Sequence, residues 1–169
     1  ALEAGLHLQL GQEVEAALRK LKEKGVKGVI LDLRGNPGGL LSQARVVAEK
    51  FLESGQVVVS TKGRSPDQNQ DYRAQGAAVL GKEVPLAVLV DRGSASASEI
   101  VAGAIQDADR GLILGTTTFG KGSVQTVVQV GGDRALKLTT ALYYTPSGRS
   151  IHRQSEDGMP GHVPITLTV

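Results

Sequence analysis

The sequence predicts an α/β fold in which helices alternate with strands and most of the strands are parallel. Three observations lead to this prediction. Apolar residues recur at helical spacing in three segments, and short apolar runs rich in β-branched residues lie between them. A glycine-rich turn late in the chain separates two further strand-like stretches, which indicates a β-hairpin. With 169 residues, the chain fits a single domain, so we expect one core over residues 1–169.

The first elements are a helix, a strand and a second helix. The apolar face of the first helix is formed by Val14, Ala17, Leu18 and Leu21. We expect this helix to end at Gly25. The nearly continuous apolar run over 26–33 is typical of a strand buried on both faces of a parallel sheet. A turn dense in Gly, Asn and Pro over 34–39 then leads into a helix over 40–53.

The second half of the chain continues this alternation and ends in the hairpin. The predicted elements are strands over 56–61 and 85–90, a helix over 96–108, a strand over 112–114, and strands over 124–130 and 135–144. The hairpin turn is Gly131-Gly132-Asp133. The polar stretch 63–83 is the longest expected loop. Within it, residues 63–78 form either a plain surface loop, which loop lengths favour, or a mobile flap.

The composition excludes several classes of site. There is no cysteine, which excludes disulfides, thiolate nucleophiles and zinc–thiolate sites. Only 3% of the residues are aromatic and the net charge of +2 comes from scattered residues, so we expect no nucleic-acid partner. No apolar run reaches the ~18 residues that span a bilayer, and residues 1–10 show no signal-peptide pattern. The three histidines are isolated, so a histidine base is a minor alternative and a metal hydrolase is not indicated.

Three loops follow strands of the predicted sheet, at the edge where ligand sites of α/β folds gather. These loops cover residues 34–39, 91–98 and 115–123. In the second loop, Ser96 has two interpretations. With Glu99 three residues later, it fits a capping box that begins a helix. Alternatively, its hydroxyl points into the cleft, and the amide of Ala97 at the helix N-terminus can stabilise an anion. The spacing by itself favours capping.

The third loop contains Gly115, Gly120 and Lys121 at nearly the spacing of a phosphate-binding P-loop. Gly122 stands where that motif needs a hydroxyl, and the following segment is predicted as a strand instead of the required helix. A nucleotide site is therefore only a remote alternative. Lys121 is then either a solvated loop lysine or an uncharged amine that takes a proton from a serine.

The first loop, R-G-N-P-G-G, also allows two interpretations. Gly38 and Gly39 permit a close approach of backbone N–H groups to a ligand. An ordinary strand-to-helix turn favours the same residue types.

Taken together, the three loops resemble the carboxyl-terminal processing (tail-specific) proteases, a family of Ser-Lys endopeptidases. The matching segments are GVKGVILDLRGNPGGLL at 25–41, GSASASEIVAGAIQDADRGLILGTTTFGKGSVQTV at 93–127 and LKLTTALYYTPSGRSI at 136–151. The resemblance extends over about residues 10–164. It implies a crotonase/ClpP-like layered core, a protein or peptide substrate cut near its C-terminus, and no metal or organic cofactor.

The resemblance also implies roles for individual residues. Ser96 corresponds to the family's nucleophile and Lys121 to its general base. Gln125 corresponds to a glutamine that supports the lysine, and it would share a strand face with Lys121 if Lys121 is already extended. The oxyanion hole corresponds to the amides of Ala97 and Gly39, with Gly38 as the alternative to Gly39.

Two departures from the family pattern bear on function. Members usually carry a PDZ domain and an N-terminal segment with an export signal, and we expect a bare protease core without either. Asp91 stands where an asparagine is common, which we expect to be harmless. The resemblance implies an extracytoplasmic location for a full-length parent. A catalytically inactive peptide-binding core is the main alternative, and the oligomeric state and cleavage preference stay open.

Overall fold

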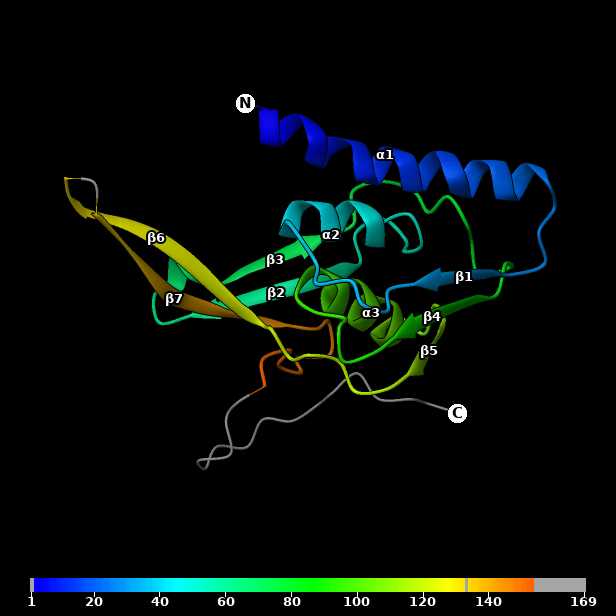
Figure 1. The fold of residues 1–169 in the computed structure, drawn as a ribbon. Coiled ribbons are helices and arrows are strands. Elements are labelled where there is room, and N and C mark those ends of the chain that lie inside the picture. The colour runs from blue at the N-terminus through cyan, green and yellow to red at the C-terminus, as the bar shows by residue number, and fades with distance from the viewer. Residues whose placement is uncertain (1, 133, 154–169) are drawn as a thin grey trace.

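The structure, a computed structural model, describes residues 2–132 and 134–153. Within this part, the chain forms three α-helices, one short 3-10 helix and seven strands in two sheets (Figure 1). The helices are α1 (Leu2–Glu23), α2 (Leu41–Ala48) and α3 (Ala97–Asp107). The predicted α/β class is confirmed. The first helix ends close to the predicted Gly25, which has a φ of +64° that favours glycine.

One sheet is parallel and carries the three loops of interest. It has the order β1–β4–β5, with β1 (Val29–Asp32), β4 (Leu86–Val90) and β5 (Leu112–Gly115). All three strands run in the same direction, so their carboxyl ends lie at one edge. The loops over 34–39, 91–98 and 115–123 leave from that edge, as predicted.

The other sheet is antiparallel and has the order β3–β2–β7–β6. Its strands are β2 (Val57–Gly63), β3 (Gln70–Arg73), β6 (Ser123–Gly131) and β7 (Arg134–Tyr144). Strands β6 and β7 form the predicted hairpin, which extends away from the helices in Figure 1. The expectation of a mostly parallel sheet was therefore wrong. Strand β2 does not join the parallel sheet because β7 returns antiparallel alongside it.

Helix α3 forms the centre of the core. Every residue from Ser98 to Ile105 is buried. Helix α2 packs against α3, and α1 packs across α2, so the helices gather on one face of the parallel sheet. The largest fully buried apolar side chains are Phe51, Leu52, Leu80, Ile100 and Ile105. No described helix combines the length and the apolar character that a membrane crossing requires.

The parallel sheet is covered on one face only. The exposed fraction of the Ile30 side chain on β1 is 69% and that of Leu112 on β5 is 57%, whereas Val88 on β4 is fully buried. The prediction that residues 26–33 form a strand buried on both faces was therefore wrong. The helices cover one face, and no described element packs against the other.

The polar stretch expected to be a long loop contains regular structure. A 3-10 helix, Pro66–Gln68, leads into β3, which pairs with β2. The sequence signal was weak because Gln70 and Asp71 are exposed at the edge of the sheet, so β3 lacks the apolar alternation of a half-buried strand.

Candidate active site

Ser96 lies at the sharp turn between the loop after β4 and the start of α3. Its backbone has φ 55° and ψ −114°, whereas an ordinary N-cap residue is extended. A non-glycine residue in such a conformation costs about 1–3 kcal/mol and is typical of functional sites. The turn also contacts the first loop, since a Cβ added at Gly38 would lie 2.9 Å from the Cβ of Ser96 and 2.4 Å from the carbonyl oxygen of Ala95. The first and second loops therefore meet at Ser96.

The buried carboxylate of Glu99 joins the second loop to the third. Its side chain is 1% exposed. Oε2 accepts hydrogen bonds from the backbone N–H of Ser96 at 2.8 Å and of Lys121 at 2.9 Å. Oε1 accepts from the backbone N–H of Gly120 at 2.7 Å and from the hydroxyl of Thr118 at 2.6 Å. Two nitrogens that share one acceptor oxygen lie within about 6 Å of each other, so the backbones of Ser96 and Lys121 are held close together.

The two interpretations of Ser96 are therefore compatible. Ser96 and Glu99 do form the predicted capping box at the start of α3. The same carboxylate also reaches the loop over 115–123, which the sequence did not indicate. A buried carboxylate loses its hydration and needs several hydrogen-bond donors in compensation, more than the helix cap alone supplies. This requirement indicates that Glu99 has further contacts outside the cap.

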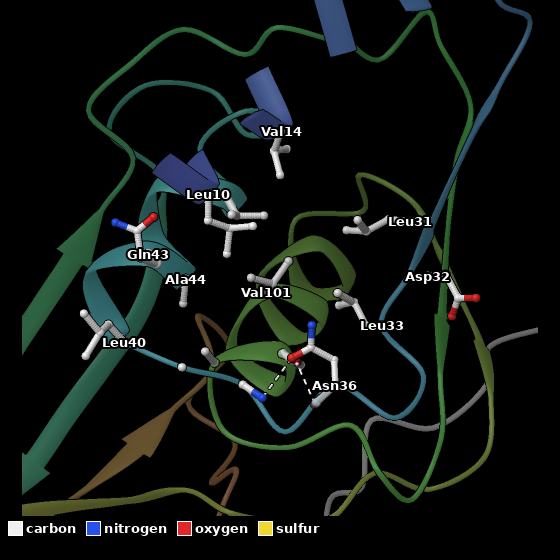
Figure 2. A pocket seen from close by; sticks show the side chains of 15 residues that line it. Leu10, Val14, Leu31, Asp32, Leu33, Asn36, Leu40, Gln43, Ala44 and Val101 are labelled. Carbon is white, nitrogen blue, oxygen red and sulfur yellow. Dashed lines mark hydrogen bonds between the residues drawn. The ribbon is translucent and has the colours of Figure 1, made fainter. Parts of the chain in front are cut away.

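The backbone N–H groups of Gly39 and Ala97 donate to no acceptor in the described part of the chain, and neither does that of Leu40, which follows Gly39. The Gly38 N–H is occupied, because it donates to Oδ1 of Asn36 at 2.9 Å. The carbonyl oxygen of Asn36 in turn accepts from Ser98 Oγ at 3.1 Å, which fixes the turn against α3 (Figure 2). Gly39 and Ala97 line one cavity of about 310 Å³. Of the two glycines considered, Gly39 is the one with a free donor.

Asp91 fastens the first loop to the second. Its pKa is held below the usual value, mainly by the hydrogen bond that the Gly35 N–H donates to Oδ1 at 2.8 Å. The Gly93 N–H donates to the same oxygen at 2.9 Å. These contacts require only an acceptor oxygen, which an asparagine also has. Next to it, the buried hydroxyl of Ser94 donates to the carbonyl oxygen of Leu33 at 2.7 Å. The sequence did not indicate that Asp91 and Ser94 connect the first loop to the second.

The side chains of Lys121 and Gln125 lie outside this buried network. Lys121 is exposed and borders an open cavity of about 730 Å³ together with Arg92, His152 and Arg153. Lys121 precedes the first residue of β6 and is not part of that strand, so Lys121 and Gln125 do not share a strand face. Gln125 is exposed on β6, pairs with Thr139 and follows an irregularity in the register. Among the described residues, no hydrogen bond joins the Ser96 hydroxyl to the Lys121 amine.

The local structure does not support a P-loop. The segment after Lys121 is β6, whereas a P-loop requires a helix whose N-terminus holds the phosphates. The strand predicted there is confirmed.

Comparison with known proteins gives one consistent result. The sequence pattern of peptidase family S41 matches residues 5–164. The chain is 52% identical over 143 residues to a carboxy-terminal-processing protease of Bartonella bacilliformis, covering 82% of this chain and 32% of that protein. It is 40% identical over 142 residues to a carboxyl-terminal-processing protease of Synechocystis, covering 84% and 32%. The chain thus spans about a third of the length of these relatives.

Solved structures agree with the sequence comparison. The photosystem II D1 C-terminal processing protease superposes with a TM-score of 0.77 at 39% identity, covering 84% of this chain and 36% of that one. An S41 protease structure from Bacteroides fragilis shares the fold alone, with a TM-score of 0.67 at 21% identity, covering 91% and 41%. The arrangement of one parallel and one antiparallel sheet around α3 is thus that of this protease core. The chain belongs to peptidase family S41, among the C-terminal processing proteases.

Proposed function

We propose that this chain is the catalytic core of a serine endopeptidase that cleaves proteins near their C-termini with Ser96 and Lys121. The observation that carries the proposal is the Glu99 carboxylate, whose Oε2 accepts the backbone N–H of both residues. Membership of a serine peptidase family makes peptide-bond hydrolysis the expected chemistry. The preference for C-termini rests on the names of the relatives.

The proposed reaction begins at the Ser96 hydroxyl. The uncharged amine of Lys121 takes its proton, and Oγ forms a bond to the carbonyl carbon of the scissile peptide. The carbonyl oxygen becomes an oxyanion that accepts hydrogen bonds from Gly39 and Ala97. When the C–N bond breaks, the Lys121 ammonium gives its proton to the leaving amine. Water then attacks the acyl-enzyme, with Lys121 as base, and releases the second product.

The exposed position of Lys121 adds one requirement to this reaction. Its amine has to turn from solvent toward Ser96, which the flexible four-carbon stem of lysine allows because the two backbones are already close. In this scheme, Gln125 supports the amine after the turn. Because only the uncharged amine accepts a proton, the cleavage rate is expected to rise with pH.

The test compares Ser96→Ala and Lys121→Ala with Lys137→Ala, a control that removes an exposed lysine from the β6–β7 hairpin. Cleavage of a peptide library is followed by mass spectrometry. The first two variants are expected to lose cleavage while they stay folded, and the control is expected to keep its activity. Ser96→Ala also loses the helix cap, which lowers the free energy of unfolding by about 0.5–2 kcal/mol, so cleavage is measured where all variants are folded. Cleavage at the unaltered rate by either dyad variant would overturn the proposal. A serine-directed covalent reagent that fails to label Ser96 would favour an inactive peptide-binding core.

A further inference from the structure

Three cationic side chains without a partner surround the open cavity beside the third loop. This cavity, of about 730 Å³, is lined by Arg92, Lys121 and Arg153, and all three side chains are exposed. In the part of the chain that the structure describes, none of the three forms a salt bridge or a side-chain hydrogen bond, and no acidic residue lines the cavity. Like charges repel, so the three cations do not stabilise one another. A cleft lined by charges of one sign attracts a ligand of the opposite sign, which here is an anion.

Backbone contacts place the two arginines on either side of the third loop. The Phe119 N–H donates to the Ser94 carbonyl oxygen at 3.0 Å, which brings the loop next to the segment that carries Arg92. On the other side, the Arg153 N–H donates to the Gly120 carbonyl oxygen at 2.9 Å. A Cβ at Gly120 would lie 2.5 Å from the Cβ of Arg153, so these two backbones are in close contact. Residues far apart in the sequence are thus held around one cavity.

The proposed reaction directs the leaving part of the substrate toward this cavity. The Lys121 ammonium gives its proton to the leaving amine, so that nitrogen has to lie within hydrogen-bond distance of the lysine. The substrate chain beyond this nitrogen is its C-terminal part, which therefore lies on the Lys121 side. The Gly39 and Ala97 amides, which receive the carbonyl oxygen, line the other cavity, and the described linings of the two cavities share no residue. A short tail that begins at Lys121 therefore enters the cavity lined by the arginines.

We propose that Arg92 and Arg153 form an anion site that binds a carboxylate of the substrate's C-terminal tail. The inference rests on the proposed function. A guanidinium group presents a planar fork of donors that matches the two oxygens of a carboxylate. Phe119, which is 58% exposed in the same cavity, offers apolar surface on which the rest of the tail can pack. Lys121 takes no part in holding the carboxylate, because its amine turns toward Ser96.

Such a site favours cleavage close to the C-terminus. A cavity of about 300–1,000 Å³ holds a drug-sized ligand, so 730 Å³ admits only a short stretch of peptide. In a longer tail, the terminal carboxylate lies outside the cavity. Every protein ends in an α-carboxylate, and the side chain of an aspartate or a glutamate in the tail supplies the same chemistry.

The experiment uses three short-tailed peptides that differ only at their last residue. The first ends in a neutral residue with a free α-carboxylate, the second in the same residue as an amide, and the third in a glutamate amide. The value of kcat/KM is measured for the unaltered chain and for the double variant Arg92→Gln/Arg153→Gln. The matched control is Arg64→Gln/Arg134→Gln, which removes two exposed arginines that do not line the cavity. Arg134 begins β7 at the far end of the hairpin (Figure 1).

An exposed ion pair changes an equilibrium constant by up to about fivefold. With two pairs, we expect the free acid to exceed the neutral amide by about 5–25-fold in kcat/KM for the unaltered chain. This ratio is expected to fall to below about twofold in Arg92→Gln/Arg153→Gln and to be retained in the control. Both peptides are measured on the same preparation, so incomplete folding of a variant does not affect the ratio.

The glutamate amide distinguishes the two sources of the carboxylate. A rate equal to that of the neutral amide supports a site for the α-carboxylate, and a rate near that of the free acid supports a site that also accepts a side-chain carboxylate. Equal rates for the free acid and both amides, or a ratio that the arginine variant leaves unchanged, would overturn the anion site.

A binding measurement separates this proposal from the proposed function. The same peptides, labelled at their N-termini, are bound to the Ser96→Ala variant and followed by fluorescence anisotropy. Absence of cleavage by the unaltered chain, together with tighter binding of the free acid than of the neutral amide, would reject the peptidase and retain the anion site. Cleavage of both peptides with no difference in rate or in binding would reject the anion site and retain the peptidase.

Discussion

Replacement of Gly38 by alanine tests whether the first loop positions the proposed oxyanion hole. The φ of Gly38 is +88°, and an L-residue in the left-handed region costs about 1–2 kcal/mol. The added Cβ would also lie 2.4 Å from the Ala95 carbonyl oxygen and 2.6 Å from the Ala97 nitrogen, so the backbone of one loop must move. Overpacking of this kind costs about 1–3 kcal/mol. Gly38→Ala is therefore expected to lower the free energy of unfolding by about 2–5 kcal/mol.

Gly35→Ala provides the matched control. The φ of Gly35 is +65°, and a Cβ there would meet no atom within 4 Å, so only the conformational cost of about 1–2 kcal/mol applies. Urea unfolding measures both stabilities, and a peptide assay at a temperature where both variants are folded measures kcat.

Gly38→Ala is expected to lose about 10²–10³ in kcat, as when one oxyanion donor is removed. Gly35→Ala is expected to stay within a few-fold of the unaltered chain. Equal kcat losses in the two variants, or an unchanged kcat in Gly38→Ala, would refute the argument that contact with Ala97 places the amides.

Two further perturbations test the hydrogen-bond networks. Glu99→Gln removes the charge that four donors share, and we expect the free energy of unfolding to fall by about 1–3 kcal/mol or more, together with kcat. The exposed control Glu53→Gln should change neither quantity, and urea unfolding that does not distinguish the two variants would contradict this role of Glu99. For Asp107, burial raises the pKa, but hydrogen bonds from Thr145, Ser147 and Arg149 outweigh it and hold the pKa below its usual value. Its carboxylate therefore adds stability above the unfolded-state pKa, which is lost as the pH falls from about 4 through the folded-state pKa. The difference in stability between the unaltered chain and Asp107→Asn should shrink between pH 7 and pH 3, and a difference that grows with acidity would be the contrary result.

The sequence predicted the elements better than their arrangement. The hairpin over β6 and β7 has a strong local signal in its glycine turn, and the structure confirms it. The exposed face of β1 was not predicted, because an apolar residue such as Ile30 has the same appearance in a sequence whether or not another layer covers it. Strand β3 was missed because polar edge strands lack the alternation that reveals a strand.

In the candidate site, too, the sequence predicted local interactions but not contacts between distant residues. The Ser96–Glu99 spacing correctly predicts a helix cap, because capping is a local interaction. The contacts of Glu99 with Gly120 and Lys121 join residues more than twenty positions apart, so no local pattern indicates them. The orientation of the Lys121 side chain and the cavity lined by Gly39 and Ala97 likewise depend on tertiary packing.

The contacts that Glu99 makes also affect when activity can first arise during synthesis. The hydroxyl and the amine of the proposed dyad reside on loops that are connected by this carboxylate's long-range contacts and by a hydrogen bond from the Phe119 N–H to the Ser94 carbonyl oxygen. Such contacts form late because distant segments must first meet. A nascent chain that has emerged only as far as α3 has no lysine loop to dock. Under the proposed function, a partly synthesised chain therefore cannot cleave neighbouring proteins. The fold itself delays proteolytic activity, as a removable pro-segment does in other proteases.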